Sequence, residues 1–280
     1  MDNEATALKK IRKNIFLTAC AGGVGHLASA FSIVEIIYAL YIKGVLCHDS
    51  KNPTWEGRDR FILSKGHGCL ALYNVLSLGG YFEEDELWTF CRPGSRMGGE
   101  PNVLELPGVE ASTGSLGHGL SIGVGMALAA RADNMDNKIY VLVGDGECQE
   151  GSIWEAVMAG MAFGLDNLYV ILDENKLQKM GFVSDIMRIN CWEERFKAFG
   201  WQVKKANGHN VADIYKQLTG EWTAGVPRVL IAQTTKGKGV SIMENAPGWH
   251  WKMPNKRELK IVMQELGITE EELEKCKRHI

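Results

Sequence analysis

The chain has 280 residues, of which 45% are apolar, and its formal net charge is −3 at pH 7. This composition suits one large α/β domain or a domain with appendages, and a near-neutral charge without a basic run excludes a nucleic-acid footprint and a polybasic membrane anchor. The seven cysteines are scattered without a Cys-x-x-Cys pair, which favours free thiols in a reducing compartment, so we expect a cytoplasmic protein.

The first part of the chain is predicted to be helical. Residues 1–13 are polar with helical character and lack the apolar core of a secretory signal. Residues 31–46 are apolar but too short to cross a bilayer, which takes about 20 residues, so they indicate a buried helix. A capping-box pattern of Ser32 and Glu35 predicts where this helix begins, and residues 70–78 form the next predicted helix.

Helices and strands alternate in the remainder of the chain. The loop-rich stretch at 83–110 is long for a plain connection and suggests a functional surface, and small residues at 114–130 predict a closely packed helix. Predicted strands at 138–143, 168–172, 201–206 and 229–234 are separated by predicted helices at 153–164 and 211–218. We therefore expect an α/β fold, with a doubly wound, mostly parallel sheet flanked by helices. A single domain should span residues 1–280, ending in a helical extension at 255–280 with a capping box at Thr269.

Polar residues follow both strands of the unit at residues 138–172. Gly144-Asp145-Gly146 closes the first strand, and Asn175 follows the second. Because such a crossover makes the two strands parallel, both segments emerge at the carboxyl edge of the sheet, where α/β folds bind ligands. A carboxylate and an amide oxygen suit a hard cation such as Mg²⁺, and Gly146 lets the backbone approach a phosphate. The pattern predicts half of a divalent-metal and diphosphate site.

Histidines beside glycine are the second chemical signal. His26, His67 and His118 all have this setting, which exposes their rings in predicted loops. An imidazole titrates near neutral pH, so such residues relay protons or hold phosphate and hydroxyl oxygens. Taken singly, each is more often a hydrogen-bonded structural group, just as an isolated Gly-Asp-Gly is often a surface turn. These residues carry a functional prediction only in combination.

The Gly-Asp-Gly segment with its later asparagine resembles the thiamine diphosphate motif. The blocks at 144–151 and 173–177 are similar to the amino-terminal half of transketolases. Further segments agree and fall in the order of that family: Gly25-His26, 64–67, 113–117 and Trp249-His250. The resemblance covers essentially the whole chain. It implies an enzyme that transfers a two-carbon ketol unit between sugar phosphates with thiamine diphosphate as cofactor.

The resemblance also implies roles for individual residues. His26 and His250 would face the reacting carbons and transfer protons. His67 would lie with His250 near the diphosphate and the substrate hydroxyls, so all three histidines are expected to be catalytic. The expected cofactor contacts, besides His67 and His250, are Gly114, Leu116, Gly146, Glu147 and Asn175.

A divalent metal accompanies this cofactor. By the resemblance, Asp145, Asn175 and the main-chain carbonyl of Leu177 would hold Mg²⁺ between the two phosphates, with Ca²⁺ or Mn²⁺ as alternatives. These are oxygen ligands, which hard cations prefer, and Mg²⁺ would complete its octahedron with phosphate and water oxygens. Removing the charged ligand Asp145 is therefore expected to weaken cofactor binding strongly.

The resemblance also implies that a second protein chain completes the enzyme. In the family, the glutamate that activates the cofactor lies on a second domain, and this chain ends at Ile280 without it. We therefore expect the amino-terminal subunit of a split transketolase, active only with a separately encoded C-terminal, pyrimidine-binding subunit in an α2β2 assembly. Glu150 matches the family position that bridges subunits and reaches the activating glutamate, so it is expected to take part in catalysis.

The sequence also departs from the family at three expected substrate positions. Glu100 replaces a histidine, His118 replaces a glutamine, and Trp251 replaces a glycine. These departures leave two alternatives open. One is a transketolase-like carboligase whose donor or acceptor has changed to a modified keto-sugar or a 2-keto acid. The other is a cofactor-binding half without transfer activity. A P-loop NTPase and a Rossmann dehydrogenase are disfavoured, because residues 235–239 lack the P-loop spacing and the glycines at 22–25 follow a helix-like segment.

Overall fold

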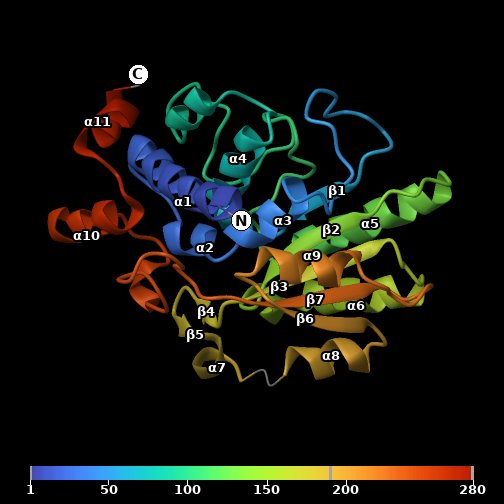
Figure 1. The fold of residues 1–280 in the computed structure, drawn as a ribbon. Coiled ribbons are helices and arrows are strands. Elements are labelled where there is room, and N and C mark those ends of the chain that lie inside the picture. Colours follow the sequence, from blue (N-terminus) through green and yellow to red (C-terminus); the bar gives the residue numbers. More distant parts are fainter. Residues whose placement is uncertain (1, 189–190, 279–280) are drawn as a thin grey trace.

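The computed structural model describes residues 2–188 and 191–278 (Figure 1). Met1 and Ile280, which the predicted domain boundaries include, lie outside the described residues. Five parallel strands form one sheet in the order β1-β2-β3-β7-β6, and helices cover both of its faces. The predicted α/β fold with a mostly parallel sheet is thereby confirmed. The strands are β1 (Arg60–Leu63), β2 (Ile139–Gly144), β3 (Leu168–Glu174), β6 (Gln202–Asn207) and β7 (Arg228–Gln233).

Alternate residues of each central strand point into two separate cores. In β2, Tyr140 and Leu142 belong to one core, whereas Val141 and Val143 belong to the other. Because successive side chains of a strand point to opposite faces, a strand covered on both faces must be apolar throughout. This requirement explains the continuous apolar runs from which the strands were predicted.

Each core is closed by its own group of helices. On one face lie α1 (Asp2–Gly22), α2 (Leu27–Phe31), α3 (Val34–Tyr41), α4 (Cys69–Leu78) and α9 (Val211–Thr219). On the other face lie α5 (His118–Ala132), α6 (Gly151–Ala162) and α8 (Trp192–Ala198). A small antiparallel hairpin of β4 (Leu177–Gln178) and β5 (Gly181–Phe182) follows β3 and leads into the short α7 (Val183–Ile186).

The predicted β2–α6–β3 unit is present. Strands β2 and β3 are adjacent and parallel, and Gly144 is in register with Asp173. The backbone N–H of Asp145 donates to the carbonyl of Asp173 at 3.3 Å, so the segments after the two strands start side by side. The second predicted unit, β6–α9–β7, also forms a parallel pair.

Two local predictions are wrong. The Ser32 hydroxyl contacts the Asp173 carboxylate at 2.9 Å, and Glu35 pairs with Arg12 at 2.7 Å, so neither side chain caps α3. Both groups are buried, and a buried polar group takes whichever partner the tertiary structure offers. Helix α5 begins at His118 and not at residue 114, because Gly117 has the left-handed backbone conformation, with φ of +85°, and stops the helix there.

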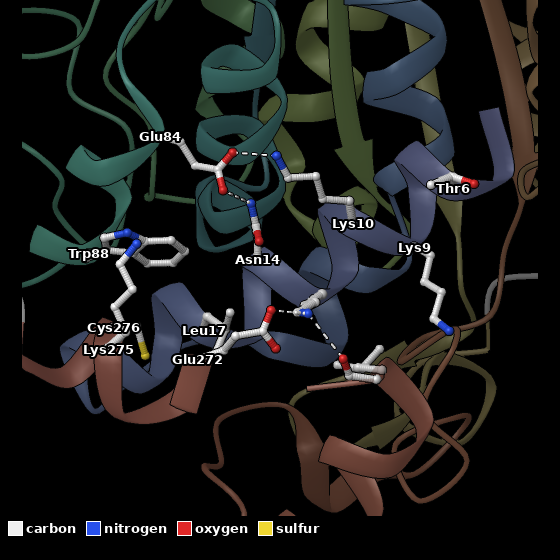
Figure 2. A pocket seen from close by; sticks show the side chains of 13 residues that line it. Thr6, Lys9, Lys10, Asn14, Leu17, Glu84, Trp88, Glu272, Lys275 and Cys276 are labelled. Carbon is white, nitrogen blue, oxygen red and sulfur yellow. Dashed lines mark hydrogen bonds and ion pairs between the residues drawn. The ribbon is translucent and has the colours of Figure 1, made fainter. Parts of the chain in front are cut away.

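The C-terminal helices pack on the first helix of the chain. Helix α10 (Lys256–Leu266) begins with an unpredicted capping box at Asn255, and α11 (Glu270–Arg278) has the predicted reciprocal cap between Thr269 and Glu272. Figure 2 shows the groove of about 500 Å³ that α11 forms with α1 and a 3-10 helix at Glu84–Thr89. Within it, Lys13 pairs with Glu272 at 2.5 Å.

No helix in the described part of the chain is long and apolar enough to cross a membrane. All seven cysteines carry free thiols.

Candidate functional site

Loops from the carboxyl edge of the sheet enclose a cavity of about 280 Å³. Lys65 follows β1, Asp145 follows β2, Asn175 follows β3 and Lys236 follows β7, and all four line the cavity. Most of the predicted site residues line it as well: His26, His67, Glu100, Gly114, Leu116, Asp145, Gly146, Glu147, Glu150, Asn175, Leu177 and His250. The cavity thus lies where parallel sheets place their ligands.

Asp145 is a buried carboxylate whose described partners are backbone groups. Its side chain accepts hydrogen bonds from the N–H groups of Gly146, at 2.7 Å, and Lys176. Burial and the negative charge of Asp173 raise the pKa of Asp145 to about 7. A bound cation would offset both effects. The carboxylate, the Asn175 amide oxygen and the Leu177 carbonyl are hard oxygen donors, so the residues present fit Mg²⁺ or a similar ion.

Asn175 is oriented by a fully buried carboxylate. Its amide nitrogen donates to Asp173 Oδ2 at 2.7 Å, which leaves its oxygen free to accept from the Leu177 N–H at 3.0 Å. Asp173 also accepts from Lys65 at 2.6 Å and from the Thr234 hydroxyl. Although burial raises the pKa of Asp173, the Lys65 ammonium and these hydrogen bonds bring it below its ordinary value. Asp173 therefore carries a charge and joins three loops of the cavity.

Lys236 connects the metal-site loop to a catalytic candidate. Its ammonium donates to the Leu177 carbonyl and lies against His250 Nδ1, both at 3.0 Å. The side chain is 2% exposed, and burial together with the positive charge of Lys65 lowers the pKa of Lys236 to about 8. Neither Lys236 nor Lys65 was predicted as a site residue, although Lys65 lies within the Ser-Lys-Gly-His block.

Three histidines form a triangular cluster at the cavity. The ring centroids of His26, His67 and His250 lie 5.1 to 5.3 Å from one another. Burial and the nearby ammonium groups lower the pKa of His26 to about 4 and that of His250 to about 3, and the pKa of His67 also lies well below its ordinary value. All three rings are therefore neutral at physiological pH. Neutral imidazoles can accept a proton or donate an N–H to a ligand oxygen.

Glu147 holds the walls of the cavity together. Its buried carboxylate accepts hydrogen bonds from the N–H groups of Gly117, at 2.9 Å, and Gly144, at 3.0 Å, and from the Ser64 hydroxyl. These contacts tie the turns after β1 and β2 to the start of α5. Glu147 was predicted as a cofactor contact, and its described hydrogen bonds are all to other parts of the chain.

Glu100 lies directly over Gly114. A Cβ atom built on Gly114 would collide with the Glu100 carboxylate, and Gly114 has φ of +146°. The Tyr73 hydroxyl, which contacts the Glu100 carbonyl at 3.0 Å and the Gly98 carbonyl at 3.1 Å, supports this loop. Desolvation raises the pKa of Glu100 above its ordinary value. The loop predicted as a functional surface thus brings an acid to the cavity wall.

Three predicted residues lie at the rim of the cavity or outside it. Glu150 is the N-cap of α6, and its exposed carboxylate has no hydrogen-bond partner among the described residues. Trp251 is 55% exposed and lies beside the cavity lining. Its ring meets the His26 ring edge-on, with 4.3 Å between the ring centroids. His118 is exposed at the start of α5 and does not line the cavity.

Comparison with known proteins adds independent findings. A family model for the thiamine diphosphate binding domain of transketolase matches residues 5–277. The chain is 41% identical over 268 residues to one subunit of an apulose-4-phosphate transketolase from Phocaeicola vulgatus, with 95% of each chain covered. It is 42% identical over 229 residues to one subunit of a 6-deoxy-6-sulfo-D-fructose transketolase from Clostridium sp., covering 81% of this chain and 83% of the relative.

Solved structures of transketolases are also similar. The enzyme from Campylobacter jejuni gives a TM-score of 0.84 at 32% identity, over 98% of this chain and 46% of that one. The enzyme from Pichia stipitis gives 0.87 at 26% identity, over 100% of this chain and 44% of that one. The chain spans less than half the length of these two proteins but nearly the whole length of the relative from Phocaeicola vulgatus.

Proposed function

The chain belongs to the transketolase family, as the thiamine diphosphate-binding amino-terminal subunit, and we propose that it transfers a two-carbon ketol unit between sugar substrates together with a separate C-terminal subunit. The observation that carries this proposal is that the buried Asp145 carboxylate lines the same cavity as the cluster of three neutral histidines. An oxygen-donor site and uncharged imidazoles in one cavity suit a metal diphosphate at one end and proton transfer at the other.

Different residues of this chain would bind the metal, bind the cofactor and transfer protons. Asp145, Asn175 and the Leu177 carbonyl would hold Mg²⁺, with Ca²⁺ or Mn²⁺ as alternatives, and Gly114, Leu116, Gly146 and Glu147 would shape the cofactor site. When bound, thiamine diphosphate would supply the nucleophilic carbon and the electron sink that ketol transfer needs. His26 and His250 would move protons at substrate oxygens, and His67 would donate to a phosphate or hydroxyl oxygen.

The C-terminal subunit would complete the cavity. Glu150 presents an unpaired carboxylate at the rim, and Met158, Met161 and Phe163 are exposed apolar residues along and just after α6, all within the described part of the chain. We propose an α2β2 assembly in the cytoplasm, with neither nucleic acid nor membrane as a partner.

Reconstitution tests the assembly. The purified chain alone should be inactive in ketol transfer, and addition of the C-terminal subunit should restore activity. Glu150→Gln should weaken the restored activity, while the control Glu155→Gln, an exposed acid on the same helix, should not. Full activity of the chain alone would contradict the proposal. Thiamine diphosphate binding without transfer in the assembled protein would support the alternative of a cofactor-binding half.

The substrate is proposed to be a keto-sugar other than the common pentose phosphates. The names of the two relatives give apulose-4-phosphate and 6-deoxy-6-sulfo-D-fructose as their sugars. In this chain, Glu100 lies at the cavity wall and Trp251 lies beside the histidine cluster. An ionised Glu100 would accept a hydrogen bond from a donor hydroxyl and repel an anionic 2-keto acid. Glu100→His should change donor use, whereas Trp251→Gly should widen the range of acceptors. Unchanged kcat/KM across a donor and acceptor panel would show that neither residue sets specificity.

A further inference from the structure

The contact between Lys236 and His250 has a consequence for the second nitrogen of the imidazole. An ammonium group has three N–H donors and no acceptor, so in the 3.0 Å contact Lys236 donates and His250 Nδ1 accepts. A neutral imidazole carries a single proton, and that proton must then be on Nε2. The pairing therefore selects one tautomer of His250.

The Nε2 atom is available to a ligand. His250 lines the cavity, and its ring lies against those of His26 and His67 without a hydrogen bond to Nε2 from any described residue. With Nδ1 occupied, the Nε2–H is the one polar hydrogen that the His250 ring can direct at a bound molecule. A hydrogen-bond donor held in a fixed direction stabilises negative charge on an oxygen without having to reorient.

The loop that carries Lys236 is held from both sides. The Thr235 N–H donates to His209 Nε2 at 2.7 Å, and His209 Nδ1 contacts Glu35 at 3.0 Å. On the other side, the Gly237 N–H donates to the Ala28 carbonyl at 2.9 Å. Gly237 has φ of +82°, and a Cβ there would collide with the backbone carbonyl of the residue packed against it, so the path of the loop admits only glycine. Lys236 has little freedom to leave His250.

We propose that Lys236 is a positioning residue that holds His250 as its Nε2–H tautomer, so that this histidine serves as a hydrogen-bond donor to an oxygen of the substrate. The role in turnover rests on the proposed ketol transfer, whereas the tautomer itself does not. His250 can accept a proton from substrate only after Nδ1 is released, which makes donation its first role. Proton acceptance then belongs to the other histidines of the cluster, among which His26 has no described hydrogen bond to either ring nitrogen.

Nitrogen NMR of the whole chain tests the tautomer directly. In ¹⁵N-histidine-labelled protein near neutral pH, His250, assigned by difference from His250→Gln, should show a protonated Nε2 and an unprotonated Nδ1. Lys236→Met keeps the length and bulk of the side chain but removes the donor, so the two nitrogens should shift toward a mixture of tautomers. The control Lys238→Met removes an exposed lysine that pairs with Glu244, and it should leave the His250 signals unchanged.

Kinetics of the assembled enzyme test the consequence. In Lys236→Met, kcat should fall on the order of ten- to a hundredfold, the range seen when an orienting partner of a functional histidine is lost. Propylammonium added to Lys236→Ala should restore part of kcat and also the Nε2–H signal. A protonated Nδ1 in the wild-type chain, or identical His250 signals in Lys236→Met, would overturn the proposal. Failure of ketol transfer with every substrate would overturn the proposed function and leave the NMR result to decide the tautomer.

Discussion

The groove between α1 and α11 and the cavity at the carboxyl edge of the sheet differ in the residues that line them. The groove between α1 and α11 has about 500 Å³ and contains partly exposed ion pairs, Lys10 with Glu84 (Figure 2) and Lys13 with Glu272. The cavity at the carboxyl edge of the sheet has only about 280 Å³. Its walls hold two buried carboxylates, two buried lysines and three histidines with lowered pKa values.

In this molecule, burial of charge marks the functional site better than volume does. Solvent-exposed ion pairs contribute little to stability, because water already screens the charges. Buried charges are costly unless each has a partner, so a fold retains them where their partners or ligands are useful. In the cavity, Asp145 has only backbone donors as described partners, and a bound cation would offset that deficit.

The largest expected effect comes from breaking the buried pair of Lys65 and Asp173. Asp173→Asn leaves the Lys65 ammonium buried at 2% exposure without its counter-ion and disturbs the Asn175 amide. The free energy of unfolding of the chain, measured by urea denaturation, should fall by about 3–5 kcal/mol. The double variant Lys65→Met/Asp173→Leu should recover part of this loss, because it removes both charges. If Asp173→Asn lowered the free energy of unfolding by less than about 1 kcal/mol, the pair of Lys65 and Asp173 would contribute no more than an exposed ion pair of the groove.

A smaller effect is expected from the histidine cluster as the pH falls. Burial and the ammonium groups of Lys236, Lys65 and Lys179 lower the pKa of His26 to about 4 from 6.5. Between pH 6.5 and about 4 the unfolded chain therefore binds a proton at this position that the folded chain does not, and stability declines as the pH falls. In His26→Asn this contribution is absent. The slope of unfolding free energy against pH should be smaller in the variant over that window, and equal slopes would contradict the lowered pKa.

The smallest effect is expected in the groove. Lys13→Met removes an ion pair whose side chains are 23% and 39% exposed, so the free energy of unfolding should fall by less than about 1 kcal/mol. Thermal or urea denaturation at low and high salt measures this, and the difference between variant and wild type should shrink at high salt because ions screen exposed charges. A loss as large as that of Asp173→Asn would remove the distinction between the groove and the cavity.

The sequence predicted the parts of the site that follow from regular structure. Asp145 and Asn175 were placed together because a β–α–β crossover puts the ends of parallel strands at one edge, and the structure brings their loops side by side. Lys236 was missed because a lysine after a strand has no local signature, and its burial depends on loops that meet only in the folded chain. Strand β1 was missed for a related reason, since four residues are too few to show a periodicity.

Ser32 shows the opposite kind of error. Its spacing to Glu35 fits a capping box, but both side chains are buried and find stronger partners in Asp173 and Arg12. At the surface, the local pattern at Thr269 predicted its cap correctly, although the capping box at Asn255 was missed, whereas in the interior tertiary contacts decide. Tertiary contacts also separate two nearby acids: Glu147 is buried among backbone donors, whereas Glu150 is exposed at the rim of the cavity.

Titration calorimetry of thiamine diphosphate with Mg²⁺ into the assembled enzyme tests the central claim, that the buried Asp145 carboxylate makes the smaller cavity a metal-diphosphate site. Asp145→Asn keeps the shape of the side chain and removes its charge. Its affinity for the cofactor should fall by at least the roughly 10- to 100-fold that loss of a residue supporting a metal ligand costs, while the exposed control Asp133→Asn should bind as the wild type does. Wild-type affinity in Asp145→Asn would contradict the claim.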